Sequence, residues 1–153
     1  MVVFTIRAAG VDDLAGIMLL QSTCLQVVDW SEGLWTHLLK ESVNGGSLRR
    51  VWVAEADGTV VGFLAQAGVA GIADLEMVVV SGAVRGEGIG RALCVQAMLW
   101  AQERGATSME LEVRASNEVA LRLYESLGFE RQGVRREYYR DPVEDAVLMS
   151  AML

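Results

Sequence analysis

Two hydrophobic periodicities alternate along the chain and predict a mixed α/β architecture. Runs in which apolar residues are continuous or occupy every second position favour strands, because successive strand side chains point to opposite faces of a sheet. Runs with apolar residues three or four positions apart favour helices. The expected strands cover residues 2–7, 51–56, 59–68, 72–80, 107–114, 129–139 and 146–152, and the expected helices cover residues 11–27, 32–42, 91–104 and 117–127.

Turn and capping residues separate these elements. Ser31 and Asn117 stand where helix N-caps are expected. Asp57 and Gly58 predict a hairpin turn, and the Asn-Gly-Gly-Ser segment at 44–47 predicts a loop. The resulting β-α-α-β-β-β-α-β-α-β-β order predicts a single α/β domain over the whole chain (1–153), with a mixed sheet of about seven strands flanked by about four helices.

The most informative stretch joins the fourth expected strand to the helix that follows it. Gly86, Gly88 and Gly90 alternate there between Arg85 and Arg91. Glycines let a ligand approach backbone N–H groups, and a helix N-terminus adds unpaired donors and a partial positive charge. Strand, glycine loop and helix together therefore predict an anion-binding site.

Three other interpretations of this loop are weaker. A Walker A loop needs the pattern G-x-x-x-x-G-K-[ST], which the chain lacks. A dinucleotide fingerprint needs a third glycine where Arg91 stands, and it belongs to a first βα unit, whereas this loop lies mid-chain. A plain strand-to-helix turn needs one glycine rather than three. What remains is the pattern R-x-x-G-x-G at Arg85, Gly88 and Gly90.

Composition narrows the function classes. With 52% hydrophobic and 22% charged residues, the 153-residue chain has the makeup of a globular protein with a sizeable core. A net charge of −7 argues against a general nucleic-acid binder and is compatible with a cationic substrate, although it also serves solubility. The apolar runs are too short to span a membrane and the N-terminus lacks a signal-peptide pattern, so we expect a cytoplasmic protein.

Cysteine and histidine are scarce. Cys24 and Cys94 lie far apart in apolar helical runs, where a buried free thiol is the usual state. His37 is the sole histidine. We therefore expect neither a metal site nor a histidine-based catalytic triad.

The R-x-x-G-x-G pattern resembles the pyrophosphate-binding motif of the GCN5-related N-acetyltransferases (the GNAT family), which use acetyl-coenzyme A as cosubstrate. The order of expected elements also matches that family over nearly the whole chain. The resemblance implies the GNAT fold and an acetyl-CoA-dependent N-acetyltransferase. A second motif of the family, N-x-x-A-x-x-x-Y-x-x-x-G-F, corresponds to Asn117, Ala120, Tyr124, Gly128 and Phe129.

The resemblance narrows to RimI-type members, which acetylate the N-terminal alanine of a small-subunit ribosomal protein. Five segments carry it: Leu-Glu-Val-Arg-Ala-Ser-Asn at 111–117, Leu-Tyr-Glu-Ser-Leu-Gly-Phe at 123–129, Arg-Arg-Glu-Tyr-Tyr at 135–139, Glu-Asp-Ala at 144–146 and Trp-Ser at 30–31. Asp29 and Gly82 stand where members usually have proline. The first of these departures lies in the substrate-side loop, so it bears on peptide specificity more than on cofactor use.

The resemblance also implies which residues hold acetyl-coenzyme A. The thioester oxygen is expected to accept a backbone N–H from the strand before the loop, an interaction of the oxyanion type. Asn117 is expected to contact the pantetheine arm, unless it is only a helix cap. The expected cofactor-binding residues are Val78, Val79, Val80, Arg85, Gly86, Glu87, Gly88, Ile89, Gly90, Arg91, Asn117 and Tyr124.

Acetyl transfer to an amine needs a neutral nucleophile and a protonated leaving thiolate. A protein α-amino group has a pKa of about 7.7–8.0, so a carboxylate acting through water can complete its deprotonation. Glu112, in the matching motif, is the candidate base, and Glu76, before the glycine loop, is the alternative. The alternative role of Glu112 is that of an exposed strand glutamate paired with a neighbouring arginine. Tyr124 is the candidate acid, because a phenol of pKa about 10 is protonated at neutral pH. It is also expected to fill the core.

Strand alternation predicts how further side chains are directed. It places Glu76 on one face together with Val78 and Val80, and it points Tyr138 and Tyr139 to opposite faces. The candidate acceptor-binding residues are Trp30, Ser31, Tyr138 and Tyr139, with packing as the alternative role of the aromatic ones.

The expected function is therefore transfer of an acetyl group to a protein N-terminal α-amine by direct attack in a ternary complex. A small-molecule amine acetyltransferase on the same fold and a non-catalytic acyl-CoA-binding regulator are the alternatives. The expected partners are acetyl-CoA and the N-terminus of a basic ribosomal protein. We expect no direct contact with nucleic acid or membrane, and a monomer or weak dimer.

Overall fold

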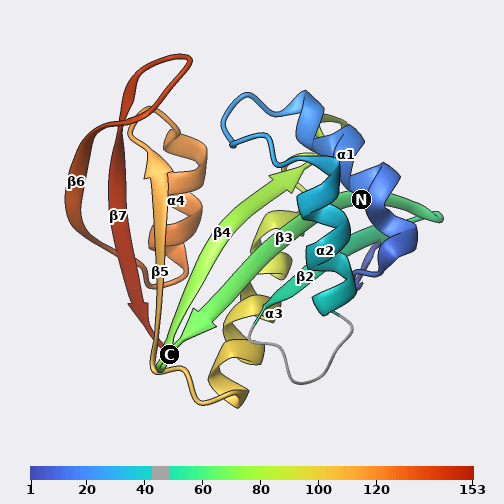
Figure 1. The fold of residues 1–153 in the computed structure, drawn as a ribbon, viewed down its shortest axis with the longest axis horizontal. Coiled ribbons are helices and arrows are strands. Elements are labelled where there is room, and N and C mark those ends of the chain that lie inside the picture. The colour runs from blue at the N-terminus through green and yellow to red at the C-terminus, as the bar shows by residue number, and fades with distance from the viewer. Residues whose placement is uncertain (43–48) are drawn as a thin grey trace.

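One mixed sheet organises the structure (Figure 1). The computed structural model describes residues 1–42 and 49–153, so the loop predicted at 44–47 lies outside the described residues. In this part of the chain seven strands follow the order β1-β2-β3-β4-β5-β7-β6, and only β4 and β5 are parallel neighbours. The strands are β1 (Thr5–Ala8), β2 (Arg50–Ala56), β3 (Thr59–Val69), β4 (Ile72–Val80), β5 (Ser108–Arg114), β6 (Glu130–Tyr139) and β7 (Glu144–Met152).

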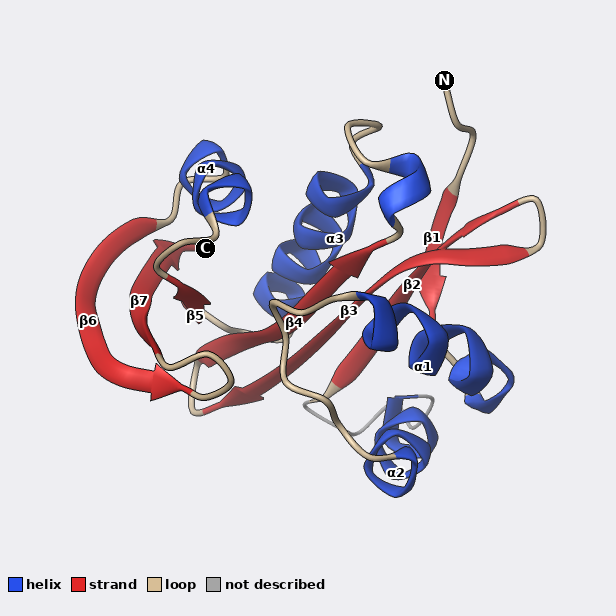
Figure 2. Ribbon diagram, turned by 90° about the horizontal axis from the view of Figure 1, so that it is seen from above, coloured by secondary structure: helices blue, strands red, loops and turns tan. Residues whose placement is uncertain are grey.

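Helices cover both faces of the sheet (Figure 2). On one face α1 packs on β3 and α2 packs on β2, around a core that contains Trp35 and Phe63. On the other face lie α3 and α4, whose core includes Leu93, Leu121 and Met109. The predicted α/β fold, a mixed sheet with flanking helices, is confirmed. The helices are α1 (Leu14–Thr23), α2 (Glu32–Ser42), α3 (Ile89–Glu103) and α4 (Glu118–Ser126).

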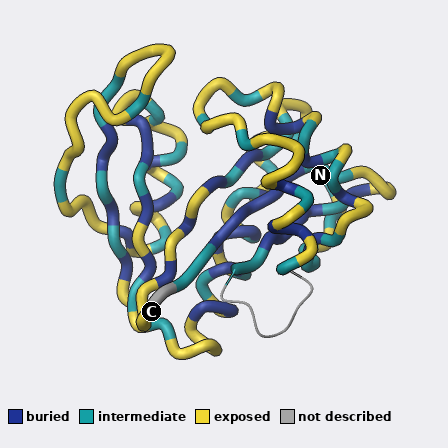
Figure 3. Tube along the Cα trace, in the orientation of Figure 1, coloured by how far each residue is buried: buried dark blue, intermediate teal, exposed yellow. Residues whose placement is uncertain are grey.

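Burial follows this layering. Strand β2 is largely buried, whereas the edge strand β6 is exposed along most of its length (Figure 3). Within the described ranges, no helix is long and apolar enough to cross a membrane.

The parallel pair β4–β5 separates halfway along its length. Its register runs from Ile72 opposite Ser108 to Leu75 opposite Leu111, and no further pairing of the two strands follows in the described part of the chain. Figure 1 shows the two strands diverging beyond this point. The sheet is therefore open between the carboxyl-terminal ends of β4 and β5.

The first helix is shorter than predicted. Residues 11–13 form a 3₁₀ turn, and α1 ends at Thr23 rather than near residue 27. Cys24 is already extended, with φ of −109° and ψ of 111°. The apolar residues after Thr23 therefore belong to the connection to α2. The buried side chain of Gln21 holds this connection in place through a hydrogen bond to Trp30.

The bulge in β4 was not predicted. Ala65 of β3 pairs with Met77, whereas its neighbour Gln66 pairs with Leu75, so Glu76 is an extra residue in the ladder. A bulge of this kind interrupts the regular alternation of side chains.

This bulge makes the predicted face of β4 wrong. Met77 and Val79 pack in the core beneath α1 and α2, whereas Val78 and Val80 pack toward α3. Glu76 therefore does not share a continuous face with the two valines.

Both predicted N-caps are confirmed. Ser31 Oγ accepts a hydrogen bond from the Leu34 amide at 3.1 Å, and Asn117 Oδ1 accepts one from the Ala120 amide at 3.3 Å. Each side chain satisfies one N–H group that the first helical turn leaves unpaired.

Gly62 of β3 allows α3 to pack closely on the sheet, and its replacement should destabilise the fold. A Cβ at Gly62 would lie 3.1 Å from Ile89 Cγ2 and 3.2 Å from the backbone oxygen of Val79. We expect Gly62→Ala to lower the free energy of unfolding by about 1–3 kcal/mol, measured by urea denaturation. Gly10→Ala is the control, since nothing lies within 4 Å of its added Cβ. If Gly62→Ala and Gly10→Ala are equally stable, α3 does not pack against Gly62 closely enough to exclude a methyl group.

Candidate active site

A cleft of about 1190 Å³ occupies the opening between β4 and β5. Its lining comes from the diverging halves of both strands, the glycine loop, the start of α4, the α1–α2 connection and the β6–β7 hairpin. Chain segments far apart in the sequence therefore contribute to one site.

The glycine loop adopts backbone conformations that favour glycine. Gly86 and Gly88 have φ of 80° and 82°, in the left-handed region where a Cβ causes strain. No atom lies within 4 Å of a Cβ built on either residue, so the loop backbone is open to a ligand. Helix α3 begins directly after Gly88, which supplies no side-chain cap. The first N–H groups of this 15-residue helix are therefore available to an anion.

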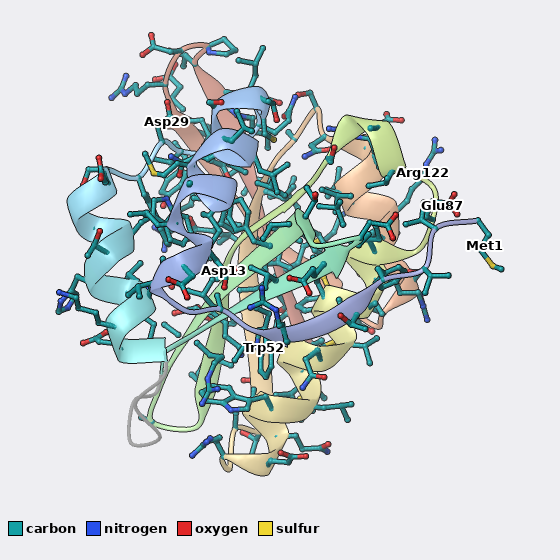
Figure 4. The ribbon with its side chains drawn as sticks, turned by 90° about the vertical axis from the view of Figure 1, so that its right-hand side faces the viewer. Met1, Asp13, Asp29, Trp52, Glu87 and Arg122 are labelled. Carbon is teal, nitrogen blue, oxygen red and sulfur yellow. The ribbon has the colours of Figure 1, made fainter. Side chains whose placement is uncertain are left out.

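The side chains around this loop fall into two groups. Arg85 and Arg91 line the cleft, and Arg91 Nη1 also donates to Ser126 Oγ at 3.0 Å. Glu87 does not line the cleft. Its carboxylate lies 3.8 Å from the amino group of Met1. Figure 4 labels both residues. Among the predicted cofactor-binding residues in the described chain, only Glu87 lies outside the cleft lining.

The other predicted cofactor residues line the same cleft. They come from three elements: the end of β4, the start of α3 and the start of α4. Asn117 lines the cleft while its Oδ1 caps α4, so the structural role of this residue does not remove it from the site. The lining residues are Val78, Val79, Val80, Arg85, Gly86, Gly88, Ile89, Gly90, Arg91, Asn117 and Tyr124.

Tyr124 belongs to both the core and the cleft. Only 5% of its surface is exposed, and its ring packs edge-on against Phe129 with centroids 5.7 Å apart. Burial raises the pKa of Tyr124, and nearby Cys94 and Tyr139 add to the shift. The phenol is therefore fully protonated at neutral pH.

Glu112 projects from β5 into the cleft, with its side chain 27% exposed. Its Oε1 lies 3.6 Å from Arg135 Nε of β6. The pKa of Tyr138 is raised, chiefly by its interaction with the same carboxylate, so the phenol lies near Glu112. A neighbouring arginine was the expected partner if Glu112 is only structural, whereas the proximity of Tyr138 was not predicted.

Glu76 lines the cleft from the β4 side. It forms an ion pair with Arg49, a residue that the sequence pattern did not single out. Burial nevertheless raises the pKa of Glu76, and the charge of Asp74 adds to this effect. The pKa of Asp74 is itself raised, by burial and by the charge of Glu112. Several carboxylates therefore face one another across the diverging strands.

The prediction that Tyr138 and Tyr139 point to opposite faces is wrong. Arg135 of β6 pairs with Ala146, and Tyr139 then pairs with Glu144, so three residues of β6 oppose one of β7. This irregularity breaks the alternation, and both tyrosines line the cleft with ring centroids 5.1 Å apart.

Trp30 and Ser31 have different positions. Trp30 lines the cleft and also packs on Trp35 with ring centroids 5.0 Å apart, so packing and cleft lining coexist. Ser31 does not line the cleft, because its hydroxyl faces the first turn of α2 as the cap.

Gln21 holds this side of the cleft and was missed from the sequence. It is 3% exposed. Its Nε2 donates to the Trp30 carbonyl at 2.9 Å, while its Oε1 accepts from the Trp30 amide at 2.9 Å and from the Trp35 indole at 3.0 Å. A polar residue directly after an apolar run in α1 was the available signal, because buried amides are usually hydrogen-bonded.

The comparisons with known proteins agree with this geometry. The sequence profile described as "Acetyltransferase (GNAT) family" matches residues 16–129. The [ribosomal protein bS18]-alanine N-acetyltransferase of Escherichia coli is 47% identical over 66 residues, which are 42% of this chain and 45% of that protein. The chain thus matches less than half the length of this relative.

Two further matches cover more of the chain. A putative [ribosomal protein bS18]-alanine N-acetyltransferase of Bacillus subtilis is 32% identical over 120 residues, covering 78% of this chain and 77% of that protein. The crystal structure of the Escherichia coli ribosomal-protein-S18-alanine N-acetyltransferase superposes with a TM-score of 0.84 at 30% identity, covering 98% of this chain and 94% of that one.

The raised pKa of Glu76 gives a test of this arrangement. Between the ordinary value of 4.5 and the raised value, the folded state binds more protons than the unfolded state, so stability falls as pH rises. Glu76→Gln stays neutral and still offers an oxygen to Arg49. We expect the unfolding free energy of this variant, relative to the unmodified protein, to increase from about pH 4 to about pH 7 in urea denaturation. If the relative unfolding free energy instead decreases over that interval, burial is not the main influence on the pKa of Glu76.

Proposed function

The chain belongs to the acetyltransferase (GNAT) family, and we propose that it transfers an acetyl group from acetyl-coenzyme A to the N-terminal α-amino group of a protein. The proposed acceptor is the N-terminal alanine of a small-subunit ribosomal protein, as the names of the relatives from Escherichia coli and Bacillus subtilis suggest. One observation carries the proposal: the glycine loop and the candidate acid and base line a single cleft.

The residues present fit acetyl-coenzyme A. The open backbone at Gly86 and Gly88, followed by an uncapped helix N-terminus, suits a pyrophosphate. Arg85 and Arg91 add positive charge beside it. The unpaired side of β4 beyond Leu75 offers backbone groups to an extended arm, because β5 no longer occupies them.

Two side chains are proposed to move the protons. Glu112 takes a proton from the α-amine through water, which leaves a neutral nitrogen that forms the new amide bond. As the carbon–sulfur bond of the thioester breaks, Tyr124 Oη gives its proton to the leaving sulfur. The second proton that the attacking nitrogen loses on becoming the amide returns to Tyr124 through solvent. The high pKa of Tyr124 keeps this proton available at neutral pH. Glu76 is the alternative base, because it lines the same cleft.

The acceptor is proposed to enter between Trp30 and the tyrosine pair Tyr138–Tyr139. These side chains lie on two walls of the cleft, the α1–α2 connection and the end of β6. The carboxylates of β4 and β5 between these walls favour a cationic acceptor, which an amine-bearing basic peptide provides.

The acceptor class can be tested with radiolabelled acetyl-coenzyme A. We expect label to enter a short peptide that begins Ala-Arg, and not the same peptide carrying a blocked α-amine and a free lysine. The reason is that the α-amine loses its proton more readily than lysine, with a pKa of about 7.7–8.0 against about 10.4. Transfer to a polyamine or an aminoglycoside but not to the peptide would reject the protein acceptor and keep the acetyltransferase. Tight binding without any transfer would favour a regulator.

Glu112→Gln tests the proposed base. We expect kcat with the peptide to fall about 100-fold at neutral pH, within the usual contribution of general-base catalysis, and to recover partly at higher pH, where the amine is already neutral. Glu130→Gln, on the exposed strand β6 outside the cleft lining, is the matched control. If the rate of Glu112→Gln is unchanged at both pH values, the base is not Glu112, and Glu76→Gln becomes the next variant to measure.

A further inference from the structure

A buried arginine lies at the end of β5 and lines the acceptor side of the cleft. Arg114 is 7% exposed, and its Nε has no hydrogen-bond partner. Long charged side chains are seldom buried to this degree without a specific set of partners. The contacts of the two terminal nitrogens therefore indicate what this residue does.

Those contacts lead to the β6–β7 connection. Arg114 Nη2 donates to the carbonyl of Arg140 at 3.1 Å, and Nη1 donates to the carbonyl of Pro142 at 3.1 Å. Nη1 also lies 3.4 Å from Glu144 Oε1. A guanidinium presents several donors in a rigid plane, so one side chain can hold two carbonyls of a turn and a carboxylate together.

Glu144 extends the network to the start of α4. Its second oxygen accepts the Ser116 amide at 2.6 Å. The Ser116 side chain, followed by this amide and by Arg114, holds the pKa of Glu144 below its usual value. The Ala115 amide donates to the Asp145 carbonyl at 3.1 Å. The hairpin connection is thereby held to the segment between β5 and α4.

The network also reaches the cleft. The Arg114 Cζ lies 4.4 Å from the centre of the Tyr139 ring, a cation–π distance. Tyr139 packs edge-on against Tyr138, and Tyr138 lies near enough to Glu112 for that carboxylate to raise the pKa of the Tyr138 phenol. A continuous series of contacts therefore runs from Arg114, through the tyrosine pair, to the proposed base.

We propose that Arg114, supported by Glu144, is a positioning residue for the acceptor: it holds the β6–β7 connection so that Tyr138 and Tyr139 keep their places on the cleft wall. This inference rests on the proposed function for the identity of the acceptor. It assigns Arg114 no contact with the reacting atoms.

None of the partners described above belongs to the glycine loop at 85–91. They lie in residues 138–145 of the β6–β7 hairpin and, through Glu144 and Asp145, at residues 115–116 before α4. Loosening the hairpin connection should therefore weaken acceptor binding and leave the binding of acetyl-coenzyme A intact.

Arg114→Lys is the principal variant, because lysine keeps the charge but cannot reproduce the planar set of donors. We expect the KM for the Ala-Arg peptide to rise about tenfold, as for the loss of one or two charge-assisted hydrogen bonds, while the Kd for acetyl-coenzyme A stays within about twofold. Arg131→Lys is the matched control, since Arg131 lies on β6 but pairs with Glu125 of α4 on the exposed surface. Arg131→Lys should change neither the KM for the peptide nor the Kd for acetyl-coenzyme A.

A second measurement does not depend on catalysis. Amide hydrogen exchange should become faster in residues 138–145 of Arg114→Lys, relative to Arg131→Lys, and stay unchanged in residues 85–91. Glu144→Gln should show the same pattern to a smaller extent, and it serves as the second variant if Arg114→Lys folds poorly.

The outcomes separate the two proposals. An unchanged peptide KM with unchanged exchange at 138–145 would overturn the role of Arg114. Equal losses of peptide and acetyl-coenzyme A binding would also overturn it, because they would show a general structural role. If the unmodified protein acetylates no amine, the proposed function fails, and the exchange pattern alone then decides whether Arg114 holds the hairpin connection.

Discussion

The separation of β4 from β5 is the constraint on which the rest of the site depends. The two strands pair over four positions, from Ile72–Ser108 to Leu75–Leu111, and then diverge. Parallel strands that stayed paired would fill the sheet and leave no space at its centre. Because they part, backbone groups of β4 are exposed in the interior of the sheet, where a ligand can reach them. The glycine loop follows β4 directly, so an anion site lies at the end of the same opening.

The two walls of the cleft are held by buried polar side chains rather than by regular secondary structure. Gln21 binds both backbone groups of Trp30 and fixes the α1–α2 connection. On the opposite wall Arg114 binds two carbonyls of the β6–β7 connection. In both places an irregular segment gains the hydrogen bonds that a helix or strand would otherwise provide. A buried polar group without partners is costly, so each of these side chains favours one arrangement of its loop.

Local departures from regular geometry direct the chemistry of the site. The bulge at Glu76 changes which side chains of β4 face each core. The irregularity in β6 turns two successive tyrosines toward one cleft and places Tyr138 against Glu112. The charge of Glu112 also raises the pKa of Asp74, which lies before the bulge. Unbroken alternation in β6 would have directed Tyr138 and Tyr139 to opposite faces of the strand.

The sequence by itself determined the element order, the helix caps at Ser31 and Asn117, the glycine loop and membership of the GNAT family, because these depend on residue type and on neighbours close in the chain. It also indicated the cleft-lining positions of Glu112 and Tyr124 through their motifs. Only the tertiary structure decided the end of α1, the faces of β4 and β6, and the orientations of Glu87 and Ser31. Those features depend on strand pairing and on buried hydrogen bonds between residues distant in sequence, such as Gln21 with Trp30 and Arg114 with Pro142, which no local pattern records.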